Sequence, residues 1–190
     1  MHHKFDVKSF AKLDNPERRK KLPPEEVLKR FGIQKGNIVA DIGCGIGYFT
    51  IPASNLVGLN GKVYAMDISD EMLNMVSERI RQSGVENIEI VQIRENDFLL
   101  ADNSADFAVA FFVLHEANDL QRFLLEIHRI LKPGGKLAII EWDKREMNQG
   151  PPVSHRVSQE DVHLWLTQTG FVVRPIKVEE DFYGLLATKE

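Results

Sequence analysis

Hydrophobic residues along the chain occur in short runs that alternate with longer amphipathic stretches. Apolar or alternating runs predict strands at residues 38–42, 62–67, 87–93, 107–114 and 136–142. The amphipathic stretches between them predict helices at residues 48–57, 69–84 and 118–131. Strands that alternate with helices at this spacing form βαβ crossovers, so the pattern predicts an α/β fold with a doubly wound, mostly parallel sheet.

The pattern changes after residue 147. The segment Gln149-Gly150-Pro151-Pro152 predicts a loop, after which Ser158 caps a helix that ends at Gly170. Two further strands are predicted at residues 171–178 and 182–189. The short charged link between them favours an antiparallel C-terminal hairpin at one edge of the sheet.

The N-terminal region is predicted to be helical. Residues 4–30 contain two helices, the first capped by Asn15 and the second beginning at Pro23-Pro24 and ending at Gly32. We interpret the basic run Arg18-Arg19-Lys20-Lys21 as a solvated helix face. We therefore expect an N-terminal helical cap, or lid, over residues 1–35 and a single domain over residues 36–190.

Composition and charge exclude several classes of protein. The 190 residues fit one domain, and a net charge of −4 without a sustained basic stretch argues against nucleic-acid binding. A single cysteine excludes an internal disulfide, and the six histidines are scattered, so we expect no metal site. Neither a membrane span nor a signal peptide is evident, which makes a cytoplasmic location the expectation. The sequence does not indicate an oligomeric state.

The first candidate for chemistry is a glycine-rich turn, Asp41-Ile42-Gly43-Cys44-Gly45-Ile46-Gly47, where the first strand enters a helix. Glycines there let the backbone approach a ligand closely. A dinucleotide fingerprint would need its third glycine at Tyr48, one residue later, which argues against a pyrophosphate ligand. A purely structural turn is the alternative, and we interpret Cys44 as small apolar packing because no base lies at motif distance.

The second candidate is Asp67, which ends the second strand about 20 residues beyond the glycines. An acid at this place can accept hydrogen bonds from both hydroxyls of a ribose. A solvated acid at a strand end is the alternative. Together, the turn and Asp67 indicate an adenosine-type ligand at the carboxyl edge of the sheet, and they leave NAD and S-adenosylmethionine (SAM) both open.

Four motifs in order resemble the class I SAM-dependent methyltransferases, in particular the ubiquinone/menaquinone-biosynthesis-like (methyltransferase type 11-like) group. They are the glycine turn, Met66-Asp67-Ile68-Ser69, Asp102-Asn103-Ser104-Ala105-Asp106-Phe107 and Leu131-Lys132-Pro133-Gly134-Gly135. The C-terminal part is similar to small prokaryotic members. The resemblance implies a Rossmann-like, seven-stranded sheet, SAM as cofactor, and methyl transfer to an unidentified small-molecule acceptor.

The resemblance also implies roles for individual residues. Gly43, Gly45 and Gly47 would lie beside the methionine part of SAM, with Asp41 orienting its amino group and Asp67 on the ribose. Further cofactor contacts would come from Ile68 and Met72 on the adenine, from Glu95 or Asn96 at its edge, and from Phe111. For Met72 the alternative is simple core packing.

The acceptor side is predicted from the strand ends that face the cofactor. Candidates are His115 and Glu116 after the fourth strand, and Glu141 and Trp142 at the end of the fifth. A hydrogen-bonded structural role is the alternative for His115, and Trp142 could simply cap the core. Arg156 could bind an anionic acceptor or pair with a nearby acid.

Two other functions remain open at this point. One is a SAM-binding protein without catalysis, acting as a sensor or a partner of another subunit, because function resides in the site and not in the fold. The other is a nucleotide-dependent oxidoreductase, which the glycine spacing opposes.

Overall fold

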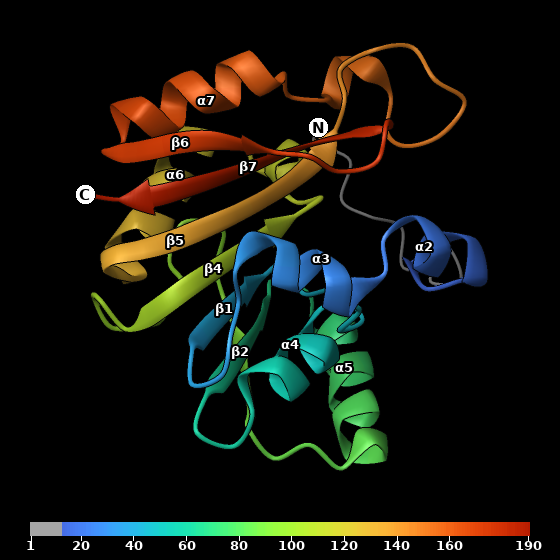
Figure 1. Ribbon diagram of the computed structural model, residues 1–190, viewed down its shortest axis with the longest axis vertical. Helices are drawn as coiled ribbons and strands as arrows, with labels where there is room; N and C mark the ends of the chain where they lie inside the picture. Colours follow the sequence, from blue (N-terminus) through green and yellow to red (C-terminus); the bar gives the residue numbers. More distant parts are fainter. Residues whose placement is uncertain (1–12) are drawn as a thin grey trace.

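The computed structural model describes residues 13–190, which form one seven-stranded sheet in the order β3-β2-β1-β4-β5-β7-β6 (Figure 1). The strands are β1 (Ile38–Ile42), β2 (Lys62–Asp67), β3 (Ile88–Gln92), β4 (Ala105–Phe111), β5 (Leu131–Trp142), β6 (Phe171–Ile176) and β7 (Phe182–Lys189). Strands β1 to β5 pair in parallel, whereas β7 is antiparallel to both β5 and β6. The predicted mostly parallel sheet with an antiparallel C-terminal hairpin is confirmed.

Helices cover both faces of this sheet (Figure 1). They are α2 (Pro16–Lys21), α3 (Pro24–Phe31), α4 (Thr50–Val57), α5 (Asp70–Ser83), α6 (Leu120–Ile130) and α7 (Gln159–Gln168), with short 3₁₀ turns at Leu114–Glu116 and Val153–His155. The apolar stripes of α6 and α7 bury their side chains in one core cluster, and those of α3 and α4 bury theirs in another. The result is the doubly wound architecture that the alternating pattern predicts.

Side-chain caps fix the starts of several helices where the sequence predicts them. The side chains of Asn15, Ser69 and Ser158 each accept a hydrogen bond from a backbone N–H in the first turn of α2, α5 and α7. Gly32 and Gly84 end α3 and α5 in the left-handed conformation, which glycine adopts without strain.

Two predicted strand boundaries are wrong by three residues or more. Strand β4 ends at Phe111, three residues earlier than predicted, because Phe112 adopts a left-handed conformation with φ of 60° and a 3₁₀ turn follows. Strand β5 begins at Leu131, directly after α6, and its register against β4 shifts between the Ala105 and Phe107 pairs. The motif Lys132-Pro133-Gly134-Gly135 is therefore an irregularity within a strand and not a turn before it.

The described part of the predicted cap, residues 13–35, is tied to the rest of the chain from both sides. Asp14 pairs with Arg79 of α5 at 2.7 Å, and Lys21 pairs with Asp181 of the β6–β7 link at 3.2 Å. The Tyr48 hydroxyl donates to the Leu22 carbonyl oxygen at 2.8 Å. Residues 1–12 of the predicted cap lie outside the described residues. No helix in the described part of the chain is long and apolar enough to cross a bilayer.

Candidate functional site

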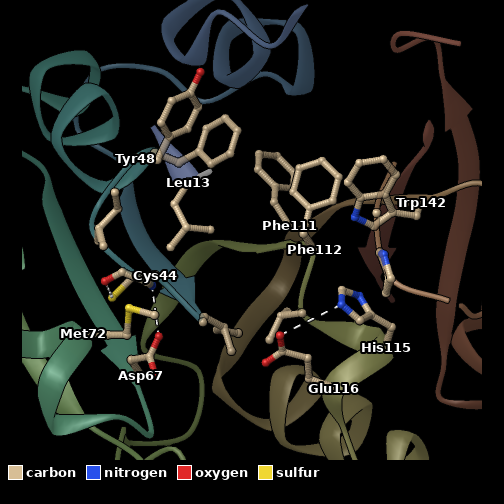
Figure 2. Close-up of a pocket in the computed structure, with 18 of the residues that line it drawn as sticks. Leu13, Cys44, Tyr48, Asp67, Met72, Phe111, Phe112, His115, Glu116 and Trp142 are labelled. Carbon is tan, nitrogen blue, oxygen red and sulfur yellow. Dashed lines mark hydrogen bonds and ion pairs between the residues drawn. The ribbon is translucent and has the colours of Figure 1, made fainter. Parts of the chain in front are cut away.

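A cavity of about 950 Å³ lies at the carboxyl edge of the sheet. Its walls include the last residues of four strands, Ile42 of β1, Asp67 of β2, Phe111 of β4 and Trp142 of β5. Helix α2, the turn after β1, the segment after β4 and the loop over residues 148–152 also contribute to the wall. Figure 2 shows Asp67 and Met72 on one side of the cavity, His115 and Trp142 on the other, and Phe111 and Phe112 between them.

The glycine turn forms one wall of this cavity. The N–H groups of Gly43 and Cys44 both donate to the Met66 carbonyl oxygen, at 2.8 and 3.0 Å, which holds the turn against β2. Gly45 has a φ of 53°, and a Cβ there would meet no atom within 4 Å. The backbone at Gly45 is therefore open to close approach by a ligand.

Gly47 has a different role from the other two glycines. It does not line the cavity, and a Cβ there would lie 2.4 Å from Cγ2 of Val76 in α5. The third glycine thus permits close packing between the turn and α5. Cys44 is buried within the turn, and burial raises the pKa of its thiol well above the ordinary value, as expected for a packing residue.

Asp67 is held in place by the backbone around it. Its Oδ2 accepts a hydrogen bond from the Gly45 N–H at 3.0 Å, and its Oδ1 accepts one from the Ser69 N–H at 2.9 Å. Burial raises the pKa of this carboxyl group, and these hydrogen bonds oppose the rise. Each carboxylate oxygen retains capacity for a further hydrogen bond on the cavity side.

Asp41 lines the cavity from the end of β1 and is only 5% exposed. Burial raises its pKa to about 7; the hydroxyl of Thr50, which donates to Oδ2 at 2.6 Å, opposes this rise, and the charge of Asp67 adds to it. A carboxylate in this position can pair with an ammonium group, and a cation nearby would favour its charged form.

The remaining predicted cofactor residues divide into two groups. Ile68, Met72, Glu95 and Phe111 line the cavity. Asn96 does not line it, and its Oδ1 is buried without a hydrogen-bond partner. The carboxylate of Glu95 accepts hydrogen bonds from the backbone and side-chain N–H groups of Asn118. Of the two candidates for the adenine edge, Glu95 is therefore the one at the cavity.

His115 and Glu141 form a hydrogen-bonded pair on the side of the cavity predicted for the acceptor. Nδ1 of His115 lies 2.9 Å from Oε2 of Glu141, whose carboxylate also accepts from the backbone N–H groups of Leu114 at 2.8 Å and Trp142 at 3.2 Å. Because a carboxylate only accepts, Nδ1 carries the proton of a neutral ring and Nε2 keeps its lone pair. Glu141 is 1% exposed and does not line the cavity, so it can act only through His115.

The charges around His115 set its protonation. Burial works to lower the pKa of the imidazole, but the carboxylates of Glu141 and Glu116 together raise it above the ordinary value. Nε2 of His115 lies 4.0 Å from Oε1 of Glu116, which also lines the cavity (Figure 2).

Three aromatic rings form the outer part of the acceptor side. The ring of Phe112 lies 5.9 Å from that of Trp142 and 5.0 Å from that of Phe182, and Trp142 and Phe182 are 4.8 Å apart. A Cβ at Gly150 would lie 2.7 Å from the Trp142 indole, so the loop over residues 148–152 packs directly on this ring. Trp142 is thus part of the cavity wall.

Arg156 serves neither of the two roles predicted for it. Its guanidinium donates to the backbone carbonyl oxygens of Pro151, Asp143, Arg145 and Gln149, at 2.7 to 3.0 Å. All three of its nitrogens, and four of its five N–H groups, thereby hold the loop after β5. Arg156 is a structural residue, and the expectation that it binds an anion or pairs with an acid is wrong.

Sequence reasoning missed Arg18. Its guanidinium carbon lies 4.9 Å from the ring centre of Tyr48 and 5.2 Å from that of Phe112, and Arg18 lines the cavity. The interpretation of the basic run as a solvated face is therefore wrong for this residue, although Arg19 and Lys20 are exposed. The sequence does contain a signal for the position of Arg18: Leu22, which is buried, lies four residues later and therefore on the same face of the helix.

In this doubly wound sheet, the strand order reverses between β1 and β4, and the glycine turn and the strand-end acid lie beside that point. This arrangement is typical of the class of enzymes that bind an adenosine cofactor. Within this class, residues 40–139 match a family described as "Methyltransferase domain". The chain is 39% identical to a SAM-dependent methyltransferase from Aquifex aeolicus of known structure, with a TM-score of 0.93 and coverage of 98% of this chain and 100% of that one.

Two curated relatives are similar over the same region. A demethylmenaquinone methyltransferase from Geobacillus stearothermophilus is 32% identical over 117 residues, which are 62% of this chain and 50% of that protein. The ubiquinone/menaquinone biosynthesis C-methyltransferase UbiE of Klebsiella pneumoniae is 39% identical over 122 residues, 61% of this chain and 49% of that protein. The chain spans about half the length of these relatives.

The chain belongs to the methyltransferase-domain family of class I, SAM-dependent methyltransferases. The resemblance inferred from the motifs is confirmed, and SAM is the cofactor of this class.

Proposed function

We propose that this chain transfers a methyl group from SAM to a small-molecule acceptor and that His115 is the base that prepares the acceptor. The observation that carries the proposal is the single cavity, which joins the glycine turn and Asp67 on one side to the His115–Glu141 pair on the other. A volume of about 950 Å³ suits a cofactor together with a small second ligand. The net charge of −4 further favours a small acceptor over nucleic acid.

The residues on the first side fit SAM. The open backbone at Gly45 provides room for the methionine part, and Asp67 has hydrogen-bonding capacity for ribose hydroxyls. Asp41 can orient the amino group, and Glu95 is available for the adenine edge. When bound, SAM supplies an electrophilic methyl group on a sulfonium, and the transfer leaves neutral S-adenosylhomocysteine.

On the second side, His115 takes up the proton of the acceptor. Nε2 of the neutral ring accepts a proton from an acceptor O–H, N–H or acidic C–H as the new bond to the methyl carbon forms. The resulting imidazolium is stabilised by Glu141, which keeps the ring oriented through its hydrogen bond with Nδ1. The aromatic rings exclude water from the acceptor, which strengthens these interactions.

We propose that residues 13–35 act as the described part of a lid over this cavity. Helix α2 lines the cavity and is tied both to α5 and to the β6–β7 link. The position of the lid over both sides of the cavity would help to shield the reaction from water.

Calorimetry with S-adenosylhomocysteine tests the cofactor side. Gly45→Val should reduce binding by more than about 100-fold, because a branched side chain would fill the space for the ligand. Gly36→Val is the matched control, since Gly36 also has a positive φ and open space around it but is exposed and does not line the cavity. Wild-type affinity in Gly45→Val would contradict the assignment.

Methyl transfer to a panel of small acceptors tests the enzyme activity itself. We expect turnover that depends on His115, because an oriented imidazole in the cavity can act as a base. A protein that only senses SAM would not need such a group. Tight binding of S-adenosylhomocysteine without turnover on any acceptor would support the non-catalytic alternative. Thermal stabilisation by NAD instead of SAM would support an oxidoreductase.

A further inference from the structure

The guanidinium of Arg18 faces the cavity without a polar partner. Its Nε is buried and has no hydrogen-bond partner. Within residues 13–190, its side chain forms cation–π contacts with Tyr48 and Phe112 but no hydrogen bond or ion pair. Buried guanidinium N–H groups are normally satisfied, so this arrangement calls for an explanation.

Polar partners are present for the cations Arg19, Lys21 and Arg156. Arg19 donates to Asp14 at 2.6 Å, and Lys21, which also lines the cavity, pairs with Asp181 at 3.2 Å. Arg156 donates to four backbone carbonyl oxygens and does not line the cavity. Arg18 is therefore the cavity-lining arginine whose donors remain available to a ligand.

The surroundings of Arg18 favour the binding of an anion. Burial lowers the pKa of the guanidinium, but an arginine stays charged at neutral pH. Its positive charge is partly shielded from water by two aromatic faces, and in such a setting a charge-assisted hydrogen bond is stronger than in solvent. The planar guanidinium matches a carboxylate, which can accept two parallel hydrogen bonds from it.

The location of Arg18 is the junction between the two sides of the cavity. Tyr48 directly follows the glycine turn, whereas Phe112 packs against Trp142 and Phe182 on the acceptor side. A carboxylate could reach this point from the methionine part of SAM or from the acceptor.

We propose that Arg18 binds a carboxylate within the cavity, supplied either by the methionine part of SAM or by an acidic acceptor. The proposal rests on the proposed methyl transfer and adds the ligand group that the lid recognises.

The first arm of the test measures the affinity of S-adenosylhomocysteine and of its decarboxylated analogue, which keeps the amine. Arg18→Met, of similar length, is compared with Lys20→Met, which removes an exposed cation from the same helix. If the carboxylate belongs to the cofactor, Arg18→Met weakens the binding of S-adenosylhomocysteine by about 10- to 100-fold and leaves the binding of the analogue unchanged. Lys20→Met leaves both unchanged, and Arg18→Lys recovers part of the loss because it restores the charge.

The second arm uses benzoate as a simple aromatic carboxylate, with neutral benzamide as its control. If the carboxylate belongs to the acceptor, Arg18→Met leaves the affinity for S-adenosylhomocysteine unchanged but weakens the binding of benzoate by about tenfold or more. The binding of benzamide is not affected. The proposal is overturned if Arg18→Met, still folded by its melting temperature, changes neither S-adenosylhomocysteine nor benzoate binding, or if benzoate fails to bind and S-adenosylhomocysteine is unaffected. Failure of the wild type to bind S-adenosylhomocysteine would instead contradict the proposed function, and benzoate binding to the free protein would still test Arg18.

Discussion

The two sides of the cavity treat charge in opposite ways. On the cofactor side, the carboxylates of Asp41 and Asp67 lie close together among backbone N–H groups and a hydroxyl. On the proposed acceptor side, the cavity wall carries the rings of Phe112 and Trp142 and the imidazole of His115, whose carboxylate partner does not line the cavity. The guanidinium of Arg18 lies at the junction of the two sides. The acidic side suits a cationic sulfonium compound, and the apolar side suits the desolvation of the group that receives the methyl. Under the proposed function, one cavity thus separates binding of the cofactor from activation of the acceptor.

The sharpest test of this separation is His115→Ala. We expect kcat to fall by about 10²- to 10⁴-fold, because a general base is lost, while the affinity for S-adenosylhomocysteine stays close to that of the wild type. Turnover assays on an acceptor found in the panel, with calorimetry on the same protein, measure both quantities. Glu141→Gln should lower kcat less and shift its pH profile, since it alters only the orientation and the pKa of the imidazole. Equal losses of affinity and turnover in His115→Ala would place His115 in the cofactor site.

The reverse behaviour is expected of Asp67→Ala. Loss of an acceptor for two ribose hydroxyls should weaken SAM binding by about 1–3 kcal/mol. At saturating SAM, kcat should be nearly unchanged, because Asp67 lies on the other side of the cavity from His115 (Figure 2). Unchanged affinity in a folded variant would remove Asp67 from the cofactor site.

A smaller effect comes from the protonation of Asp41. Its pKa is raised by burial to about 7, so its charge, and with it the attraction for the ammonium of the cofactor, is lost as the pH falls below that value. We expect the affinity for S-adenosylhomocysteine to fall by up to about tenfold per pH unit below pH 7, and this dependence to be absent in Asp41→Asn. Calorimetry between pH 6 and 8 measures it. A flat profile in the wild type would contradict the role of Asp41.

The same raised pKa has an opposite consequence for the free protein. A group whose pKa is higher in the folded state contributes stability that is fully present below its unfolded pKa and is lost as the pH rises through the folded value. The unliganded chain should therefore lose stability between about pH 4 and pH 7 on account of Asp41, with the loss absent in Asp41→Asn. Denaturant titrations across this range test the difference.

The smallest expected effect is that of Tyr48→Phe, which removes one hydrogen bond to the Leu22 carbonyl oxygen. The free energy of unfolding should fall by about 0.5–1.5 kcal/mol, while the affinity for S-adenosylhomocysteine changes little. Chemical denaturation and calorimetry on the same variant distinguish these two quantities. A large loss of affinity would mean that the phenol contacts the cofactor and does not merely anchor the cap.

The cofactor side could be predicted from the sequence because its parts are local. The glycine turn and Asp67 each follow directly from one strand, and the strand order brings them together. The acceptor side depends on contacts between distant segments, such as those of Phe112 with Arg18 and Phe182. No periodic pattern reports such contacts, so the sequence places Arg18 on a solvated helix face and Phe182 only at the start of a strand.

The boundary errors have a similar origin. Hydrophobicity continues from β4 through Leu114, but the left-handed conformation of Phe112 ends the strand before it. Likewise, the Pro-Gly-Gly sequence looks like a turn, yet the ladder with β4 resumes across it after a register shift. In both places, strand pairing and backbone conformation, and not the pattern of hydrophobic side chains, determine where the strand begins or ends.

The ties that hold α2 have a consequence for the traffic of small molecules. Asp14–Arg79 and Lys21–Asp181 are partly exposed ion pairs, and such pairs contribute at most about 1 kcal/mol each. Besides the hydrogen bond from Tyr48 to Leu22 and the cation–π contacts of Arg18, two weak ion pairs thus hold α2, and salt in the medium weakens them. If α2 acts as part of the proposed lid, ligand exchange becomes faster as ionic strength rises, and the salt content of the surroundings then contributes to the rate of product release.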